Sequence, residues 1–340
     1  MKKEMLLVYM LVFILMVYGC GTLSQSELSY KIETETTEMD TQDVFIPEKV
    51  EAEKELEKKD TAKKFKKNVS KIRKRNETKV VKKNEECKTI EWSDDWKYAE
   101  NSKIHSDSIT LYRSREDSKK NIIVAVNAGH GTNGGSNIYT LCHPDGSPKM
   151  TGGSTDKGNI KAVAVATGTT MLDGTSEAMV TLKLAVILKE VLLDAGYDVL
   201  MIREKDDVQI DNVARTVYAN NNADCHISLH YDSTHDDKGL FCIGVPNISE
   251  YKSMEPVASH WKEHNVLGKA IIEGEKEHNV KLYGNGFMGM DLTQISYSTI
   301  PSVDIEAGDR ASDYSKETMY NVAKGIVSGV DEFFEKLEND

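Results

Sequence analysis

The chain has 340 residues, of which 39% are hydrophobic, so it can form one large domain or two smaller ones with a sizeable core. Its formal charge of -12 is unevenly placed: residues 1–118 hold 23 Lys and Arg against 23 Asp and Glu, whereas residues 119–340 hold 20 against 32. We expect no nucleic-acid partner for this acidic part, because binding phosphates requires the opposite sign of charge.

The first 20 residues are typical of a secretory signal peptide. Lys2 and Lys3 precede an apolar run, residues 5–18, that is too short for a spanning helix. The run ends in Val17-Tyr18-Gly19-Cys20, which resembles a lipobox, the cleavage and acylation site of bacterial lipoproteins. This resemblance implies an extracytoplasmic protein that is anchored to the bacterial cell membrane by a lipid on Cys20. An uncleaved signal anchor, with Cys20 incidental, is the alternative.

Residues 21–88 have the composition of a disordered, charged tether. They are rich in Ser, Thr, Glu and Lys and almost free of aromatic residues, which is poor material for a packed core. Residues 63–83 contain eleven Lys and Arg against one acid, Glu77. This basic stretch is either a solvated spacer or a contact with anionic lipids or wall polymers. Residues 89–118 regain aromatic and apolar residues, so we expect a lead-in segment that packs on the main domain.

Residues 119–340 alternate between strand and helix patterns and form the expected catalytic domain. Apolar runs predict strands at 122–126, 198–202, 225–230, 240–245 and 302–305. Helical periodicity predicts helices at 176–195, 208–221, 257–278 and 314–337. This alternation favours an α/β sandwich with a mainly parallel sheet.

A long segment rich in Gly and Thr, residues 131–175, separates the first strand from the first helix. A loop of this length in a compact domain usually has a function. We expect it to form a wall of a substrate groove. A surface excursion without a role and an inhibitory segment that covers the site are the alternatives.

Four polar residues occupy the ends of predicted elements. His130 follows the first strand, Glu177 opens the first helix, His230 ends the third strand and Glu306 ends the last. In open α/β sheets, ligands bind beyond the carboxyl ends of the strands. Two imidazoles with one carboxylate are a common catalytic zinc set, and a further carboxylate beside them can act as general base. The pattern therefore predicts a zinc hydrolase site.

The order of the surrounding motifs resembles the catalytic domain of the zinc-dependent N-acetylmuramoyl-L-alanine amidases. The resemblance runs from about residue 121 to residue 334, nearly the whole domain. In chain order, the residues that carry it are Gly129-His130, then Glu177 with Leu182, Leu184, Ala185 and Leu188, then Gly196-Tyr197-Asp198-Val199 and Arg203, then Arg215 and Ala219-Asn220, then Ala223-Asp224 and Ser228-Leu229-His230, and last Pro301-Ser302 with Glu306 and Gly308.

The resemblance implies that His130, Glu177 and His230 bind one Zn²⁺ and that Glu306 is the catalytic base. It implies a three-layer α/β sandwich whose mixed, mainly parallel six-stranded sheet is flanked by helices. The substrate would be peptidoglycan or a muropeptide, cleaved between N-acetylmuramic acid and L-alanine. The chain departs from the family in the long insertion before Glu177, in Asn127-Ala128 where an acidic residue and proline are frequent, and in Asp309 where an aromatic residue is usual.

Two other interpretations compete with this one. His260-Trp261-Lys262-Glu263-His264 matches the inverted zinc-peptidase motif H-x-x-E-H, which on a helix places both histidines on one face. We instead interpret this segment as the solvated start of a helix. The second alternative is a non-catalytic wall-binding lipoprotein, which would not need all four of the residues His130, Glu177, His230 and Glu306.

Overall fold

The computed structural model describes residues 87–114 and 119–339. The predicted signal peptide, the lipobox with Cys20 and almost all of the predicted tether lie outside these residues. Within the described part, none of the helices combines the length and the hydropathy that crossing a membrane requires.

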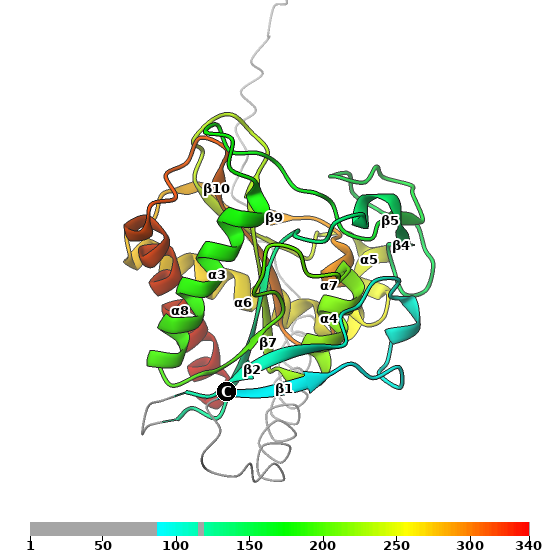
Figure 1. Ribbon diagram of the computed structural model, residues 1–340, viewed down its shortest axis with the longest axis horizontal. Helices are drawn as coiled ribbons and strands as arrows, with labels where there is room; N and C mark the ends of the chain where they lie inside the picture. Colours follow the sequence, from blue (N-terminus) through cyan, green and yellow to red (C-terminus); the bar gives the residue numbers. More distant parts are fainter. Residues whose placement is uncertain (1–86, 115–118, 340) are drawn as a thin grey trace, which may run out of the picture. The chain divides into compact units, whose positions relative to one another are not determined.

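A mixed, mostly parallel sheet of eight strands forms the centre of the fold (Figure 1). Its strands lie in the order β1-β2-β6-β3-β7-β10-β8-β9. The pairs β6–β3, β3–β7, β7–β10 and β8–β9 are parallel, whereas β1–β2, β2–β6 and β10–β8 are antiparallel. The strands are β1 Cys87–Glu91, β2 Ser108–Tyr112, β3 Ile123–Ala128, β6 Asp198–Met201, β7 Cys225–Asp232, β8 Leu240–Gly244, β9 Leu282–Gly289 and β10 Ser302–Asp309.

The prediction of an α/β sandwich is confirmed, but the sheet has eight strands rather than six. The additional strands lack a continuous apolar run. β1 lies at one edge and only Ile90 of its residues is buried. β9 lies at the other edge, and its glycines and mostly exposed or half-buried side chains give it no apolar pattern typical of a buried strand. The residues expected as a lead-in thus contribute most of β1 and all of β2 to the sheet itself. β1 begins at Cys87, so the last two residues of the predicted tether are in a strand.

Helices cover both faces of the sheet (Figure 1). α3 (Glu177–Asp194), α6 (Val257–Glu277) and α8 (Lys316–Asn339) share the main hydrophobic cluster with one face. α4 (Asn212–Asn222) covers the other face together with the aromatic residues that follow β1, and α7 (Thr293–Tyr297) packs on α4. The short α5 (Ser249–Ser253) packs on α6. This arrangement leaves the carboxyl ends of β3, β7 and β10 uncovered by helices, as a site at that edge requires.

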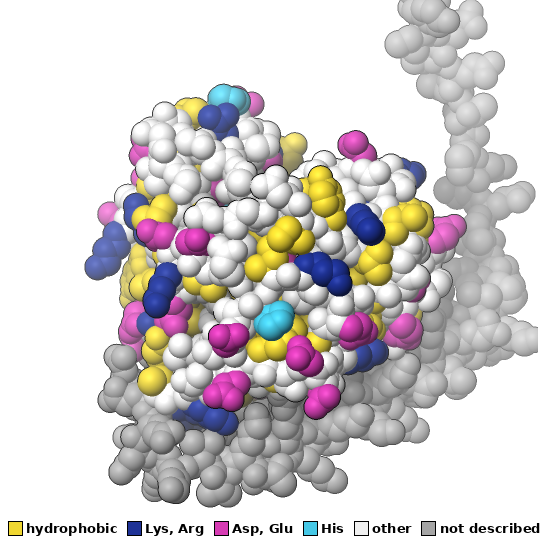
Figure 2. Space-filling model, turned by 45° about the vertical axis from the view of Figure 1, so that its right-hand side comes forward, with side chains coloured by type: hydrophobic (Ala, Val, Ile, Leu, Met, Phe, Trp, Pro, Cys, Tyr) yellow, Lys and Arg dark blue, Asp and Glu magenta, His cyan; other side chains and the backbone are white. Residues whose placement is uncertain are grey.

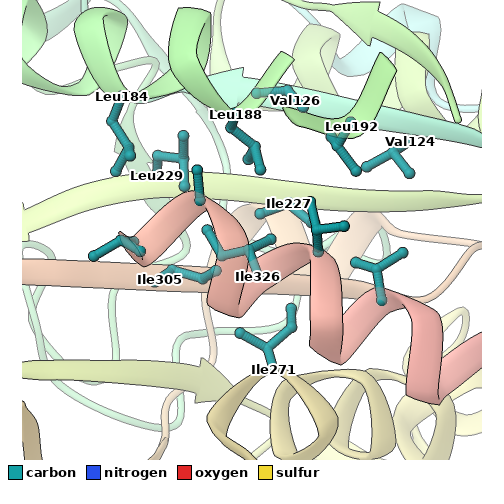
Figure 3. Packing of buried hydrophobic residues seen from close by; sticks show 14 of the residues in the cluster. Val124, Val126, Leu184, Leu188, Leu192, Ile227, Leu229, Ile271, Ile305 and Ile326 are labelled. Carbon is teal, nitrogen blue, oxygen red and sulfur yellow. The ribbon is translucent and has the colours of Figure 1, made fainter. Parts of the chain in front are cut away.

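Helix α3 shows how the sequence specifies one of these layers. Ser176 caps its first turn by accepting the Met179 N–H. Leu184, Leu188 and Leu192 recur every four residues, are fully buried and point at the strands (Figure 3). The helix ends at Asp194, before Gly196, whose φ of 93° favours glycine.

Residues 131–175 contain no α-helix. They include the 3₁₀ turn Gly135–Asn137 and a separate hairpin of β4 (Tyr139–Leu141) and β5 (Lys161–Val163).

On the face shown in Figure 2, acidic and basic side chains are interspersed, and the hydrophobic side chains form small groups between them.

Helices α6 and α8 cross at very short range because glycines lie at the contact. A Cβ on Gly274 would lie 2.2 Å from the carbonyl oxygen of Gly325, and one on Gly329 would lie 2.3 Å from the Cα of Ile271. Glu275 is fully buried at this crossing, and neither of its carboxylate oxygens has a hydrogen-bond partner among the described residues. Burial raises the pKa of Glu275 well above its ordinary value.

We therefore expect Glu275→Met to stabilise the fold by about 1–3 kcal/mol at pH 7, because it removes a buried carboxyl without partners. Because the pKa of Glu275 is raised in the folded state, the wild-type carboxyl lowers the free energy of unfolding least below the ordinary pKa of 4.5 and lowers it more as pH rises. The gain should accordingly shrink when unfolding in urea is followed at pH 4. Glu273→Met, which changes an exposed glutamate on the same helix, is the control and should change stability little.

Candidate active site

The side chains of His130, Glu177 and His230 meet at the carboxyl end of the sheet. His130 follows β3, His230 lies near the end of the neighbouring β7, and Glu177 is the first residue of α3. The Nε2 of His130 lies 2.8 Å from Oε1 of Glu177 and 3.0 Å from Nδ1 of His230, which is itself 3.2 Å from the same Oε1. The structure thus brings together the three residues that the sequence predicted as ligands.

These three atoms fit a divalent cation because their other bonds leave them as electron donors. Nδ1 of His130 lies 2.7 Å from the carbonyl oxygen of Ala166, so it carries the proton and Nε2 is bare in the neutral ring. Nε2 then faces a carboxylate oxygen and a second imidazole nitrogen, and such a group of acceptors repels itself unless a proton or cation lies between them. Among the described residues, these three form the group of possible metal ligands whose ligand atoms all lie within 4.8 Å of one another. Two histidines with one glutamate are a ligand set that zinc prefers.

Two buried arginines shape the backbone that carries His130. This residue has φ of 62°, an unusual conformation outside glycine. Arg215 donates to the carbonyl oxygens of Ala128 and His130 at 2.7 and 2.5 Å. Arg203 donates to the carbonyl oxygens of Ala128 and Gly129 at 3.1 and 2.8 Å. The guanidinium groups therefore stabilise the turn that directs the His130 ring at the site.

The end of the insertion also touches the ligands, through a segment that we name the strap, residues 166–169. Its Ala166 carbonyl fixes the His130 ring, and its Thr169 N–H donates to Oε2 of Glu177 at 2.8 Å. Gly168, between them, has φ of 82°, and a Cβ there would lie 2.8 Å from the His130 ring and 2.9 Å from Glu177 Oε2. The strap therefore positions two of the three ligand residues.

Glu306 and Asp304 approach the site from β10. Glu306 lies beside His230 in the parallel pairing of β7 and β10, and the two-residue period places Asp304 on the same face. Oδ2 of Asp304 lies 3.7 Å from His230 Nε2, on the side of the ring away from the ligand cluster. Oε2 of Glu306 is buried and has no hydrogen-bond partner among the described residues. It is therefore free to exchange a proton with a reacting group.

The charges of the site shift the pKa values of its members. Burial raises the pKa of Glu306 well above its ordinary value. Burial lowers the pKa of His230, but the carboxylates of Asp304, Glu177 and Glu306 outweigh this and raise it to about 9. Burial likewise raises the pKa of Glu177, but the hydrogen bonds with His130 and His230 outweigh it and leave that pKa below its ordinary value. Glu177 is therefore held as a carboxylate, the form in which it can bind a metal.

A cavity of about 650 Å³ opens over these residues. One wall comes from the insertion, which contributes Lys149, Gly153–Thr155, Ala162–Val163 and Val165–Thr169. An apolar part of the lining includes Phe241, Ile243, Met288 and Met290. The prediction that residues 131–175 wall a groove matches this geometry. None of their side chains is a member of the ligand cluster.

The buried Asp291 anchors that wall. Its carboxylate accepts hydrogen bonds from the Met150 and Thr151 N–H groups at 2.5 and 3.2 Å. Lys149 donates to the Asp291 carbonyl oxygen at 2.6 Å, and His143 Nε2 lies 3.4 Å from the carboxylate. The insertion is thus fastened to the segment after β9, and its Lys149 is already paired where it reaches the cavity.

Two of the departures from the family pattern have structural roles. Asp309 accepts hydrogen bonds from Thr234 and from the Lys238 N–H, at 2.8 Å for the latter, and so fixes the loop after β7. Asn127 accepts from Arg215 through its amide oxygen at 2.8 Å and donates to Ser228 through its amide nitrogen at 2.9 Å. Neither departure removes a member of the ligand cluster.

The competing H-x-x-E-H segment lies in α6 and forms a different kind of contact. Nδ1 of His260 lies 3.2 Å from Glu263, and His264 is fully buried, with Nδ1 accepting the Ser302 N–H at 2.9 Å. The two rings are 6.3 Å apart. The prediction of a solvated helix start is therefore wrong for His264, which lies in the core, and the described contacts of this segment do not assemble a ligand set.

The double variant His260→Gln, His264→Gln is accordingly expected to retain the zinc content of the wild type, measured by elemental analysis after dialysis. Its melting temperature should fall, because His264 no longer accepts the Ser302 N–H in the core. His130→Gln is the matched change in the cluster and should lose zinc. Loss of zinc from the α6 variant alone would instead favour the peptidase interpretation.

Comparisons with known proteins identify a family and a similar fold. A family model described as N-acetylmuramoyl-L-alanine amidase matches residues 124–332. The apo N-acetylmuramyl-L-alanine amidase of Mycobacterium abscessus is 19% identical, and the match covers 63% of this chain and 98% of that one with a TM-score of 0.50. The enzyme of Mycobacterium smegmatis is also 19% identical, with coverages of 63% and 97% and a TM-score of 0.49.

The comparison with curated proteins finds no match. At 19% identity and a TM-score of 0.50, the similarity to the Mycobacterium abscessus structure shows the fold alone. The family model, however, spans more than half of the chain and includes His130, Glu177, His230 and Glu306. The chain therefore belongs to the N-acetylmuramoyl-L-alanine amidase family.

Proposed function

We propose that this protein is a zinc-dependent hydrolase that cleaves the amide between the lactyl group of N-acetylmuramic acid and L-alanine of the stem peptide. The observation that carries the proposal is the convergence of three electron-donating ligand atoms beside an unpartnered, buried carboxylate oxygen of Glu306. His130, Glu177 and His230 would hold Zn²⁺ through Nε2, Oε1 and Nδ1. Zinc bound there would supply a Lewis acid and lower the pKa of water at the site.

Glu306 moves the proton in this scheme. Its carboxylate accepts a proton from the attacking water as the new C–O bond forms at the amide carbonyl carbon. It then donates that proton to the leaving nitrogen as the C–N bond breaks, which gives the lactyl carboxylic acid and the amine of L-alanine. The remaining proton of the water then passes from the acid to the amine, so that the products are a carboxylate and an ammonium group. Asp304 stabilises the orientation of His230 from the far side of the ring, where a carboxylate commonly supports a ligating histidine.

The same proposal extends to the location of the enzyme. The lipobox-like sequence that ends in Cys20 supports a lipid anchor in the bacterial cell membrane, with the catalytic domain outside the cytoplasm. A peptidoglycan substrate fits that location, because the wall lies on the outer side of this membrane. Metabolic labelling with a radioactive fatty acid tests the anchor, and Cys20→Ser should abolish the label.

The activity is tested by incubating muropeptides with the purified full-length chain and analysing the products by mass spectrometry. The chain is used after chelation of metal and again after zinc is restored. We expect stem peptides that begin with a free L-alanine amine, formed only when zinc is present. Zinc binding without any release would contradict the proposed activity and favour a wall-binding protein.

A further inference from the structure

We propose that Gln294 is a substrate-binding residue that donates a hydrogen bond to an amide carbonyl oxygen of the substrate, next to the bond that is cleaved. The inference deepens the proposed function and rests on it for the identity of the substrate. It depends on a line of buried polar side chains that runs from Arg215 to the cavity. Gln294 lines the cavity, whereas the members of the line before it lie behind the cavity wall.

The line begins with a group that can only donate. Nη1 of Arg215, which is fully buried, donates to Oδ1 of Asn127 at 2.8 Å. The orientation of the Asn127 amide is thereby fixed, with its nitrogen on the other side. That nitrogen donates to Oγ of Ser228 at 2.9 Å. Both amide atoms of Asn127 are therefore committed.

The direction of the hydrogen bond from Ser228 then fixes the orientation of the Gln294 amide. Because Oγ of Ser228 already accepts from Asn127, its own proton is left for Oε1 of Gln294, 2.7 Å away. The Gln294 amide is thus oriented with its oxygen toward Ser228 and its nitrogen away from it. This nitrogen has no hydrogen-bond partner among the described residues, although Gln294 is only 5% exposed. An amide donor without a protein partner, on a nearly buried residue that lines the cavity, is suited to an acceptor on a ligand.

The charges of the cavity select a neutral acceptor. The described residues that line it include four carboxyl groups, on Glu177, Asp232, Asp304 and Glu306. Lys149, the lysine among the described lining residues, is already bound to Asp291. A substrate carboxylate beside Gln294 would be repelled by these acids, whereas a carbonyl oxygen would not. The neutral amide donor of Gln294 matches a carbonyl of the peptide or of an acetamido group.

The position along the strand distinguishes this carbonyl from the one that reacts. Ser228 lies two residues before His230 on the same face of β7, which is about 7 Å along a strand. Gln294 is hydrogen-bonded to Ser228, so it would bind a substrate group about one peptide residue away from the group at the ligand cluster. The acceptor is therefore a neighbouring carbonyl of the muramoyl peptide, and Gln294 sets the register in which the reacting amide meets Glu306.

The test is the affinity of N-acetylmuramoyl-L-alanyl-D-isoglutamine for the zinc-loaded full-length chain, measured by calorimetry in the Glu306→Gln background so that turnover during the measurement is strongly reduced. Gln294→Met, which keeps the length of the side chain but removes the donor, should raise Kd about 3- to 10-fold. Gln294→Glu should raise it further, because the carboxylate still accepts from Ser228 but turns an acceptor toward the substrate carbonyl. Gln209→Met, the same change at an exposed glutamine outside the cavity, should leave Kd unchanged.

A variant behind the cavity wall separates orientation from mere packing. Asn127→Asp still accepts from Arg215 but can no longer donate to Ser228, whose proton then turns to the new carboxylate. The Gln294 amide is released to rotate, so we expect a similar rise in Kd from a residue that does not line the cavity. Adding Gln294→Met to Asn127→Asp should produce no further loss, which is the coupling expected of one line of bonds.

The outcomes separate this inference from the proposed function. Unchanged Kd in both Gln294 variants, or no binding by the parent chain, would overturn the inference. Additive losses in the double variant would overturn the orienting role of Asn127. Weakened binding in the Gln294 variants of a chain that shows no amidase activity would retain the donor role of Gln294 and discard the proposed reaction.

Discussion

Glu306→Gln is expected to lower kcat for amide hydrolysis about 10²- to 10⁴-fold, the range that a positioned general acid–base group contributes. Zinc affinity should be unchanged, because Glu306 is not a member of the ligand cluster. Glutamine keeps the shape of the side chain but cannot take the proton of the attacking water. The position of Glu306 beside His230 in the β7–β10 pairing makes this loss chemical rather than structural.

The measurement is a steady-state assay of L-alanine-terminated peptide release, together with the zinc content of the same sample. Glu317→Gln, an identical change at an exposed position of α8, is the control and should be fully active. A Glu306→Gln variant that retains zinc and wild-type kcat would remove Glu306 from the mechanism. Loss of zinc along with activity would instead make Glu306 part of the metal site.

The residues with the chemistry could be predicted from sequence because each stands at the end of a regular element. His130 follows the buried strand β3, His230 lies near the end of the largely buried strand β7, and Glu177 opens a helix with a leucine every four residues. These local patterns place the three residues at one edge of a parallel sheet without any knowledge of the loops. The strands that were missed, β1, β2 and β9, lie toward the edges of the sheet, where partial burial leaves no such pattern.

The supporting contacts could not be predicted because they depend on tertiary positions. Gln294 lies on a five-residue helix far along the chain from Ser228, and no spacing connects the two. The strap acts through a carbonyl of Ala166 and an N–H of Thr169, groups that every such residue has. Sequence therefore indicated a functional insertion but not which of its residues reach the site.

Gly168→Ala is expected to weaken zinc binding about 10- to 100-fold, the effect typical of losing a contact that orients metal ligands. The added methyl group would lie 2.8 Å from the His130 ring and 2.9 Å from Oε2 of Glu177, so both ligands must move. The strap cannot easily yield instead. Beyond it, Arg310 donates to the Thr170 carbonyl at 2.5 Å and accepts the Leu172 N–H at 3.0 Å.

Gly174→Ala in the same insertion is the control for the effect of backbone strain. Gly174 has φ of 91°, close to the 82° of Gly168, but a Cβ at this position meets no atom within 4 Å. Both variants therefore bear the cost of a left-handed alanine, about 1–2 kcal/mol, and only Gly168→Ala disturbs the ligands. Competition with a fluorescent zinc chelator should show near wild-type affinity for Gly174→Ala. Equal affinities in the two variants would mean that the strap covers the ligands without positioning them, and the insertion would then serve the substrate alone.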